Sequence, residues 1–219
     1  SYLYIKSYSK DKIQTSYEQL EILIPLFNEL EIKKKIPHTR GYAASPDYLF
    51  EIKNIIKKEK PKLILEAGSG VSTLISAYSL KKYGEGQIIS LDHEKLYADK
   101  TTIELKKHNL EKYANILYAP LKKYDNDLLW YDTDDALQGL DLIDLFIIDG
   151  PPKNSSKNAR FPVLPLMFNK MKIGTIIILD DARRKSEQDT VLLWKQKYDC
   201  FDYQYIDNDK GLIIMKKIN

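Results

Sequence analysis

The chain has 219 residues, of which 43% are hydrophobic and 30% are charged. This composition excludes a disordered tail or a collagen-like fibre and favours one globular domain with a sizeable core. The formal net charge is only +3 and the lysines are scattered, so charge alone does not indicate nucleic-acid binding.

The first part of the chain, residues 1–60, is predicted to form a helical extension. Apolar residues recur at helical spacing over residues 17–30. Such an amphipathic helix can cover a sheet edge, line a substrate pocket or form a dimer seam. After a loop, Ser45 followed by Pro46 is typical of a helix start, which predicts a second helix over residues 46–58. We expect this extension to cover the sheet and an acceptor pocket.

After Pro61, short apolar runs alternate with helical patterns. Because parallel strands need long crossover connections, this order predicts a Rossmann-like, doubly wound α/β domain over residues 61–219. Two closing runs joined by a short polar turn predict an antiparallel hairpin, which completes a seven-stranded sheet. The acidic, polar residues 122–139 are interpreted as a linker-like connection. The predicted strands are residues 63–67, 87–91, 114–118, 142–148, 175–179, 201–206 and 212–215, and the predicted helices are residues 72–82, 94–108, 162–171 and 187–198.

The first predicted strand ends in a glycine turn, Glu66-Ala67-Gly68-Ser69-Gly70, that leads directly into a helix. Ligands of a parallel sheet bind beyond the carboxyl ends of its strands. The two glycines allow a sharp turn, and the helix start offers free N–H groups. A dinucleotide site has a third glycine where Thr73 stands, which speaks against NAD. Glu66 suits a nucleoside ligand with an amino-acid tail, because its carboxylate can face an ammonium group.

The second predicted strand ends in Ser90-Leu91-Asp92-His93-Glu94, about twenty residues after the glycines. A carboxylate at this offset is placed to bind both hydroxyls of a ribose, a role that we assign to Asp92. Glu94 is the alternative, although an acid at a helix start also has the simpler role of offsetting the helix dipole. His93 is interpreted as a surface or stacking residue.

Three carboxylates follow the fourth and fifth predicted strands, namely Asp149, Asp180 and Asp181. Their mutual repulsion would be costly without a cation, and oxygen-rich sites suit Mg²⁺ or Mn²⁺. The alternative is that Asp181 caps the next helix and that Arg183 or Arg184 neutralises the other acids. Both hypotheses stay open at this point.

Cys200 is the only cysteine, which excludes an internal disulfide and a multi-cysteine zinc site. His38, His93 and His108 lie far apart, so any metal would be held mainly by carboxylates. No apolar run approaches the roughly 18 residues of a membrane span, and the first residues lack the apolar region of a signal peptide. We therefore expect a soluble, cytoplasmic protein.

These strand ends resemble the class I S-adenosylmethionine-dependent methyltransferases. The glycine turn is similar to that superfamily's first motif, Asp92 to its ribose-binding acid and Asp149 to its acid after the fourth strand. The resemblance is closer to a bacterial group of small methyltransferases. It implies that S-adenosylmethionine is the cofactor, bound by Glu66, Gly68, Ser69, Gly70, Ser72, Thr73, Asp92, His93 and Asp149. The blocks that match this group are residues 39–47, 66–74, 90–94, 149–152, 159–162, 164–165 and 179–184.

The fourth and fifth strand ends also resemble catechol O-methyltransferase and its metal-dependent relatives. Gly174 precedes Asp180 and Asp181 at the spacing of those enzymes' Asp-Asn pair, with Asp181 in place of Asn. The resemblance implies a divalent ion, Mg²⁺ or Mn²⁺, held by Asp149, Asp180 and Asp181. The chain departs from these relatives at Pro152, where they have a lysine base.

Lys153, next to that proline, is one candidate for the general base. Asp181 and His38 are the others, unless a metal makes a protein base unnecessary. Arg160 and Arg40 are placed to clamp an anionic acceptor such as a phosphate or uronate, although each is also interpreted as a structural tie. The predicted catalytic residues are Asp149, Asp181, Lys153, Arg160 and His38.

The sequence thus predicts O-methylation of a sugar, a glycan precursor or another small hydroxylated metabolite. N-methylation of a nucleic acid or protein is an alternative, weakened because Gly150 interrupts the Asp-Pro-Pro motif and Lys153 replaces its aromatic residue. A nucleotide-binding oxidoreductase and a binding module without catalysis are further alternatives. The expected partner is a small-molecule or glycan acceptor, and not nucleic acid. The oligomeric state stays open, because residues 17–30 can mediate a homodimer, although packing on the sheet is the commoner fate of such an apolar stripe.

Overall fold

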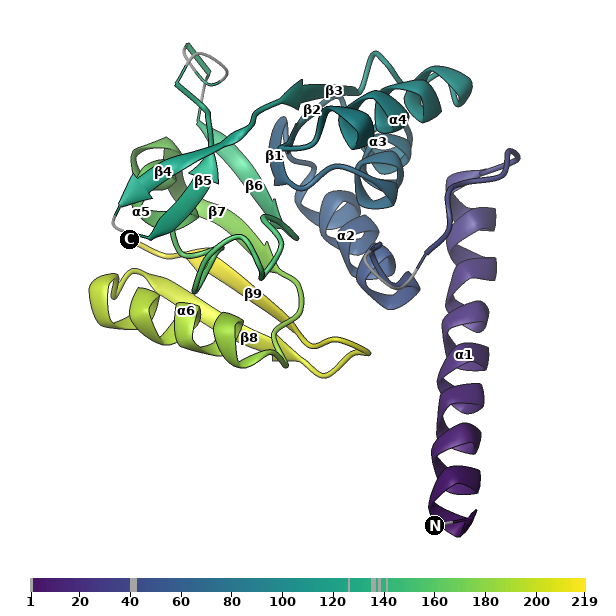
Figure 1. The fold of residues 1–219 in the computed structure, drawn as a ribbon. Helices are drawn as coiled ribbons and strands as arrows, with labels where there is room; N and C mark the ends of the chain where they lie inside the picture. The colour runs from purple at the N-terminus through teal and green to yellow at the C-terminus, as the bar shows by residue number, and fades with distance from the viewer. Residues whose placement is uncertain (1, 40–42, 126, 135–136, 138, 141) are drawn as a thin grey trace.

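The computed structural model describes residues 2–39, 43–125, 127–134, 137, 139–140 and 142–219, with side chains from residue 13 onward. Two helices come first, and the strands follow with further helices between some of them (Figure 1). The helices are α1 (Tyr2–Leu30), α2 (Pro46–Glu59), α3 (Val71–Tyr83), α4 (Lys95–Lys107), α5 (Val163–Met167), the short 3₁₀ helix η1 (Phe168–Lys170) and α6 (Lys185–Lys197). The strands are β1 (Leu63–Ala67), β2 (Gln87–Asp92), β3 (Ala114–Tyr118), β4 (Leu121–Asp125), β5 (Leu128–Tyr131), β6 (Ile143–Ile148), β7 (Met171–Leu179), β8 (Phe201–Ile206) and β9 (Leu212–Lys217).

Seven strands form one sheet in the order β3-β2-β1-β6-β7-β9-β8. The pairs from β3 to β7 are parallel, and β9 is antiparallel to both β7 and β8. This confirms the predicted Rossmann-like, mostly parallel sheet with an antiparallel C-terminal hairpin. The strand order reverses between β1 and β6, so the carboxyl ends of these two strands mark the position where a ligand is expected.

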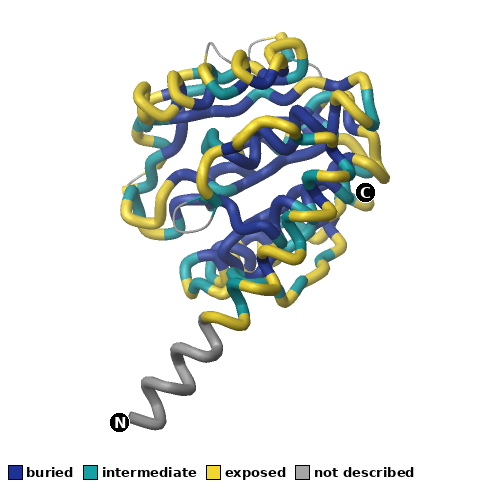
Figure 2. The backbone as a smooth tube through the Cα atoms, turned by 90° about the vertical axis from the view of Figure 1, so that its right-hand side faces the viewer, coloured by how far each residue is buried: buried dark blue, intermediate teal, exposed yellow. Residues whose placement is uncertain are grey.

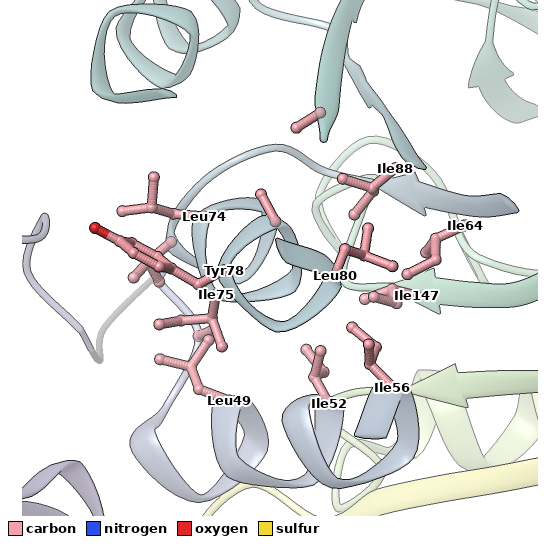
Figure 3. Packing of buried hydrophobic residues seen from close by; sticks show 14 of the residues in the cluster. Leu49, Ile52, Ile56, Ile64, Leu74, Ile75, Tyr78, Leu80, Ile88 and Ile147 are labelled. Atoms are coloured by element: carbon pink, nitrogen blue, oxygen red, sulfur yellow. The ribbon is translucent and has the colours of Figure 1, made fainter. Parts of the chain in front are cut away.

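Successive side chains of a strand point to opposite sides of the sheet, and helices pack on both sides. On one side Ile147 of β6 packs with Ile52 of α2 and Ile75 of α3 (Figure 3). On the other side Phe146 of the same strand packs with Trp194 of α6. The strands therefore lie in the buried centre of the molecule, with exposed helix surfaces outside them (Figure 2).

The N-terminal helix α1 begins earlier than predicted, at Tyr2 instead of residue 17, and packs on α2 and α3. Its buried end contributes Leu26 and Leu30 to the core. In the preceding part of the same helix, four large apolar side chains are exposed, namely Ile13, Tyr17, Leu20 and Ile24. A homodimer through this helix stays a prediction. Among the described helices, none has the length and apolarity that a membrane span requires.

Two further predicted segments differ from the structure. Residues 122–139 are not simply a linker, because they contain most of an antiparallel hairpin, β4–β5. This hairpin packs on the face of the sheet that also carries α5. The helix predicted over residues 162–171 ends earlier, in η1, and β7 begins at Met171. The predicted pattern missed this start because the first part of β7 has exposed and polar residues.

Candidate active site

The glycine turn after β1 brings the ends of three strands together. Gly68 has φ 98°, which favours glycine, and its N–H donates to the carbonyl of Leu91 at 2.9 Å. The N–H groups of Asp149 and Gly150 both donate to the carbonyl of Ala67, at 3.1 and 2.7 Å. A Cβ atom on Gly68 would lie 3.2 Å from the Gly150 nitrogen. The crossing of these two loops thus depends on their small residues.

Glu66 lies beneath the turn and does not line the cavity at the ends of the strands. Its Oε2 accepts hydrogen bonds from Thr73 Oγ1 at 2.5 Å and Ser90 Oγ at 2.6 Å. Thr73 Oγ1 in turn accepts from the Gly70 N–H at 3.0 Å. Neither Glu66 nor Thr73 is a cavity-lining residue. Where a dinucleotide site has a third glycine, this chain therefore has a threonine that ties the turn to a buried acid.

Burial raises the pKa of Glu66 from its ordinary 4.5 to about 7, although hydrogen bonds from Ser72, Ser90 and Thr73 lower it. The folded protein then holds a proton that the unfolded chain releases as the pH rises from 4.5 to 7. Folding stability should fall over this window, by about 3 kcal/mol. Glu66→Gln should remove that loss, so its free energy of unfolding should vary less between pH 5 and 8 than that of the wild type.

Urea denaturation across this pH range measures the effect, with Glu111→Gln as a control because Glu111 is exposed. Parallel pH profiles for the wild type and Glu66→Gln would contradict the assignment.

Asp92 ends β2 beside the glycine turn. It is only 5% exposed. Its Oδ2 accepts from Ser69 Oγ at 2.5 Å, and its Oδ1 accepts from the Glu94 N–H at 3.0 Å. These bonds fix the carboxylate at the place predicted for a ribose. His93 has a side chain 23% exposed, and its ring meets the edge of Tyr131 at a centroid distance of 6.1 Å.

The three acids after β6 and β7 lie around Arg160, whose side chain is 2% exposed. Its Nη2 donates to Asp181 Oδ2 at 2.8 Å and to Asp149 Oδ1 at 3.3 Å, and also to the Asp149 carbonyl. Its Nη1 donates to the Asp180 carbonyl at 2.7 Å. Arg160 thus ties the ends of β6 and β7 together, which is one of its two predicted roles, and its role as a clamp for an anionic acceptor stays a prediction.

The two arginines after Asp181 have different partners. Arg184 Nη1 lies 2.6 Å from Asp181 Oδ2, whereas Arg183 pairs with the exposed Asp207 at 2.7 Å. Asp181 adopts φ 62° and does not cap α6, which begins at Lys185 without a side-chain cap. Arg184 therefore pairs with Asp181 itself, whereas the non-metal alternative predicted that it pairs with the other acids, and the capping half of that alternative is wrong. The other predicted clamp, Arg40, lies outside the described residues.

The acid cluster retains unused ligand atoms. Asp149, Asp180 and Asp181 each offer one oxygen within 4.8 Å of the others. Asp180 is fully buried, and neither of its carboxylate oxygens has a hydrogen-bond partner among the described residues. Burial and the charges of Asp149 and Asp181 raise the pKa of Asp180 above its usual range. Lys210 Nζ is 4.0 Å from Asp180 Oδ2. An all-oxygen donor set that includes a buried carboxylate without a hydrogen-bond partner among the described residues fits a hard divalent cation.

One cavity of about 610 Å³ joins these elements. Exposed His38 and Lys153 lie on its lining, as do Ala43 and Ala44 from the segment before α2. Most of the predicted site residues thus share one cavity. Those that line it are His38, Gly68, Ser69, Gly70, Ser72, Asp92, His93, Asp149, Lys153, Arg160 and Asp181.

Sequence reasoning missed Tyr131 and Lys210, which also line the cavity. Tyr131 is the last residue of β5, within the segment interpreted as a linker. Four consecutive apolar or aromatic residues, 128–131, are the signal that could have predicted this strand. Lys210 lies in the polar turn between β8 and β9, and no pattern in the sequence connects it with the strand ends.

Comparison with known proteins agrees with this geometry. A family model described as "Methyltransferase domain" matches residues 65–182. The chain is similar in structure to the SAH-bound Podospora anserina methyltransferase PaMTH1, with TM-score 0.65, 14% identity and 96% of each chain covered. It is also similar to a Bacillus cereus O-methyltransferase in complex with SAH, with TM-score 0.64, 15% identity and 90% of each chain covered.

A third similar structure is the Streptomyces achromogenes O-methyltransferase TomG in complex with SAM, with TM-score 0.64 and 12% identity. The match covers 89% of this chain and 86% of TomG. No curated protein gives a significant match to the sequence. The family model covers more than half of the chain and includes the glycine turn and the acids after β2, β6 and β7. The chain therefore belongs to the methyltransferase-domain family, within the class I S-adenosylmethionine-dependent methyltransferases.

Proposed function

We propose that the enzyme transfers the methyl group of S-adenosylmethionine to a hydroxyl oxygen of a sugar, a glycan precursor or another small hydroxylated metabolite. The observation that carries this proposal is that a single cavity is lined by the predicted donor residues Gly68 and Asp92 and by the acids Asp149 and Asp181. Donor and acceptor can therefore meet in one cavity. The structural similarity to two O-methyltransferases supports oxygen as the acceptor atom.

S-adenosylmethionine supplies a methyl group on a positively charged sulfur. In the proposed complex, Asp92 accepts hydrogen bonds from the ribose hydroxyls, and the backbone around Gly68 allows the methionyl part to approach closely. The carboxylates beside that turn place negative charge near the donor's cationic groups. The chain's contribution is mainly to hold donor and acceptor in line, because positioning supplies much of the acceleration of such a transfer.

The pairing of the cavity's two arginines favours an uncharged acceptor. Arg160 and Arg184 are already bound to the acid cluster, so they are not free to clamp a phosphate or uronate. An anionic acceptor would also meet the carboxylates of Asp149 and Asp181. Exposed His38 and Lys153 line the same cavity and can reach an acceptor hydroxyl as general base. A neutral polyhydroxylated molecule is therefore the acceptor class that we propose.

We further propose that Asp149, Asp180 and Asp181 hold a divalent cation, Mg²⁺ or Mn²⁺, beside the acceptor. Such an ion lowers the pKa of a bound hydroxyl group and fixes its angle. Asp180 has both oxygens available, whereas Asp149 and Asp181 each share an oxygen with Arg160. Asp180→Asn should therefore weaken Mn²⁺ binding at least tenfold, as followed by electron paramagnetic resonance of the free ion.

Asp99→Asn is the matched control, because Asp99 is exposed and pairs only with Lys95 among the described interactions. Equal Mn²⁺ binding by wild type and Asp180→Asn would remove Asp180 from the site. Absence of Mn²⁺ binding by the wild type, together with full activity in EDTA, would overturn the metal proposal and leave Arg160 as the cation of the cluster.

Transfer of the tritium-labelled methyl group from S-adenosylmethionine to a candidate acceptor tests the reaction itself. Candidate acceptors are neutral sugars, catechols, primary amines, RNA and a protein mixture. The proposal predicts labelled O-methyl ethers from one of the hydroxylated small molecules. Labelling confined to amines, RNA or protein would contradict it and support the N-methyltransferase alternative.

A further inference from the structure

Tyr131 occupies an unusual position for a fully buried aromatic residue. Its side chain is 1% exposed, yet its hydroxyl has no hydrogen-bond partner among the described residues. The residue lines the cavity together with Asp92 and Gly150. A Cβ atom on Gly150 would lie only 2.2 Å from the Tyr131 hydroxyl oxygen. The hydroxyl therefore packs directly against the turn where the ends of β1 and β6 cross.

The aromatic ring is held in this position from two sides. Trp130 meets it edge to face at a centroid distance of 5.2 Å, and His93 does so at 6.1 Å. The ring thus bridges the end of β2, which carries Asp92, and the turn at Gly150. Burial, with the charge of Asp92, raises the pKa of Tyr131 well above its usual range, so the hydroxyl keeps its proton at neutral pH. It is therefore available as a hydrogen-bond donor.

A buried hydroxyl is normally paired, because water is lost and nothing replaces it. Around Tyr131 the neighbouring polar groups have other partners. Asp92 is bonded to Ser69 and to the Glu94 N–H. The hydroxyl oxygen is buried against Gly150, and Tyr131 lines the cavity together with Gly68 of the glycine turn and Asp92 of the proposed ribose site.

We propose that Tyr131 is a further donor-binding residue, whose hydroxyl forms a hydrogen bond with the ribosyl-methionyl part of S-adenosylmethionine. This inference rests on the proposed function of the cavity. It also gives Gly150 a role, because any side chain at that position would collide with the Tyr131 hydroxyl. The hairpin β4–β5 then belongs to the donor site and is more than a connection between β3 and β6.

Tyr131→Phe tests this role with isothermal titration calorimetry of S-adenosylhomocysteine. The variant should bind the ligand about tenfold more weakly, the effect of one lost hydrogen bond. The melting temperature of the ligand-free variant should be unchanged or higher, because the hydroxyl has no protein partner to lose. A merely structural role predicts the opposite combination, lower stability with unchanged affinity.

Tyr48→Phe is the matched control. Tyr48 is also fully buried with an unpaired hydroxyl, but it does not line the cavity, so its variant should keep wild-type affinity. Adenosine, which has the ribose but no methionyl group, is titrated as a second ligand. If Tyr131→Phe binds both adenosine and S-adenosylhomocysteine more weakly, the hydrogen bond is with the ribose. If it binds only S-adenosylhomocysteine more weakly, the hydrogen bond is with the methionyl group. Unchanged affinity in Tyr131→Phe would overturn the inference alone, whereas a wild type that binds no S-adenosylhomocysteine would overturn the proposed function as well.

Discussion

Replacing Asp92 by alanine should weaken the binding of S-adenosylhomocysteine at least a hundredfold. A ribose offers two hydroxyls to this carboxylate, and hydrogen bonds to a charged group contribute about 1.5–3 kcal/mol each. Their loss therefore costs about 3 kcal/mol or more, which corresponds to a factor above a hundred in the dissociation constant. The carboxylate is already oriented by Ser69 and by the Glu94 N–H, so little is lost in ordering it on binding.

Calorimetry on folded protein measures this effect, and two further variants define its cause. Asp92→Asn keeps the shape but removes the charge, so its affinity should lie between those of wild type and Asp92→Ala. Asp99→Ala removes an exposed acid of α4 and should bind like the wild type. If Asp92→Ala is folded and binds the ligand as tightly as the wild type, the ribose does not lie at the end of β2.

Replacing Arg160 by methionine should lower the free energy of unfolding by about 3–5 kcal/mol, the usual effect of removing one partner from a buried ion pair. Methionine preserves most of the apolar stem but leaves Asp149 and Asp181 without their shared donor. Asp180 lies beside them, fully buried. The carboxylates would then repel one another in a site with little access to water.

Arg183→Met is the control, because Arg183 pairs with Asp207 at the surface, where both side chains are more than half exposed. Its loss should change stability by no more than about 1 kcal/mol. Urea denaturation of both variants at pH 7 provides the comparison. Equal small losses would mean that Arg160 is not the residue that holds the acid cluster together.

The sequence predicts the fold well where neighbouring residues alone determine the secondary structure. β1, β3 and β8 lie at their predicted residues, because short runs rich in apolar residues between polar breaks are typical of strands. The sequence also placed the acids correctly, since the carboxyl ends of parallel strands meet at one edge of the sheet. Asp92, Asp149 and Asp181 accordingly line one cavity.

What the sequence did not predict depends on contacts between distant residues. Arg160 lies 11 positions after Asp149 and 20 before Asp180, and no local pattern shows that it sits among them. Glu66 is withdrawn from the cavity by Thr73 and Ser90, which come from α3 and β2. Tyr131 was overlooked because its hairpin interrupts a polar segment. In each case the partner comes from another element, so the pairing is visible only in the folded chain.

We propose that the cavity at the strand ends binds S-adenosylmethionine. A calorimetric titration of the wild type with S-adenosylhomocysteine and, separately, with NAD, each with and without Mg²⁺, tests this proposal. We expect one molecule of S-adenosylhomocysteine bound per chain with micromolar affinity, and no binding of NAD. Binding of NAD alone, or no binding of S-adenosylhomocysteine by a folded protein, would contradict it.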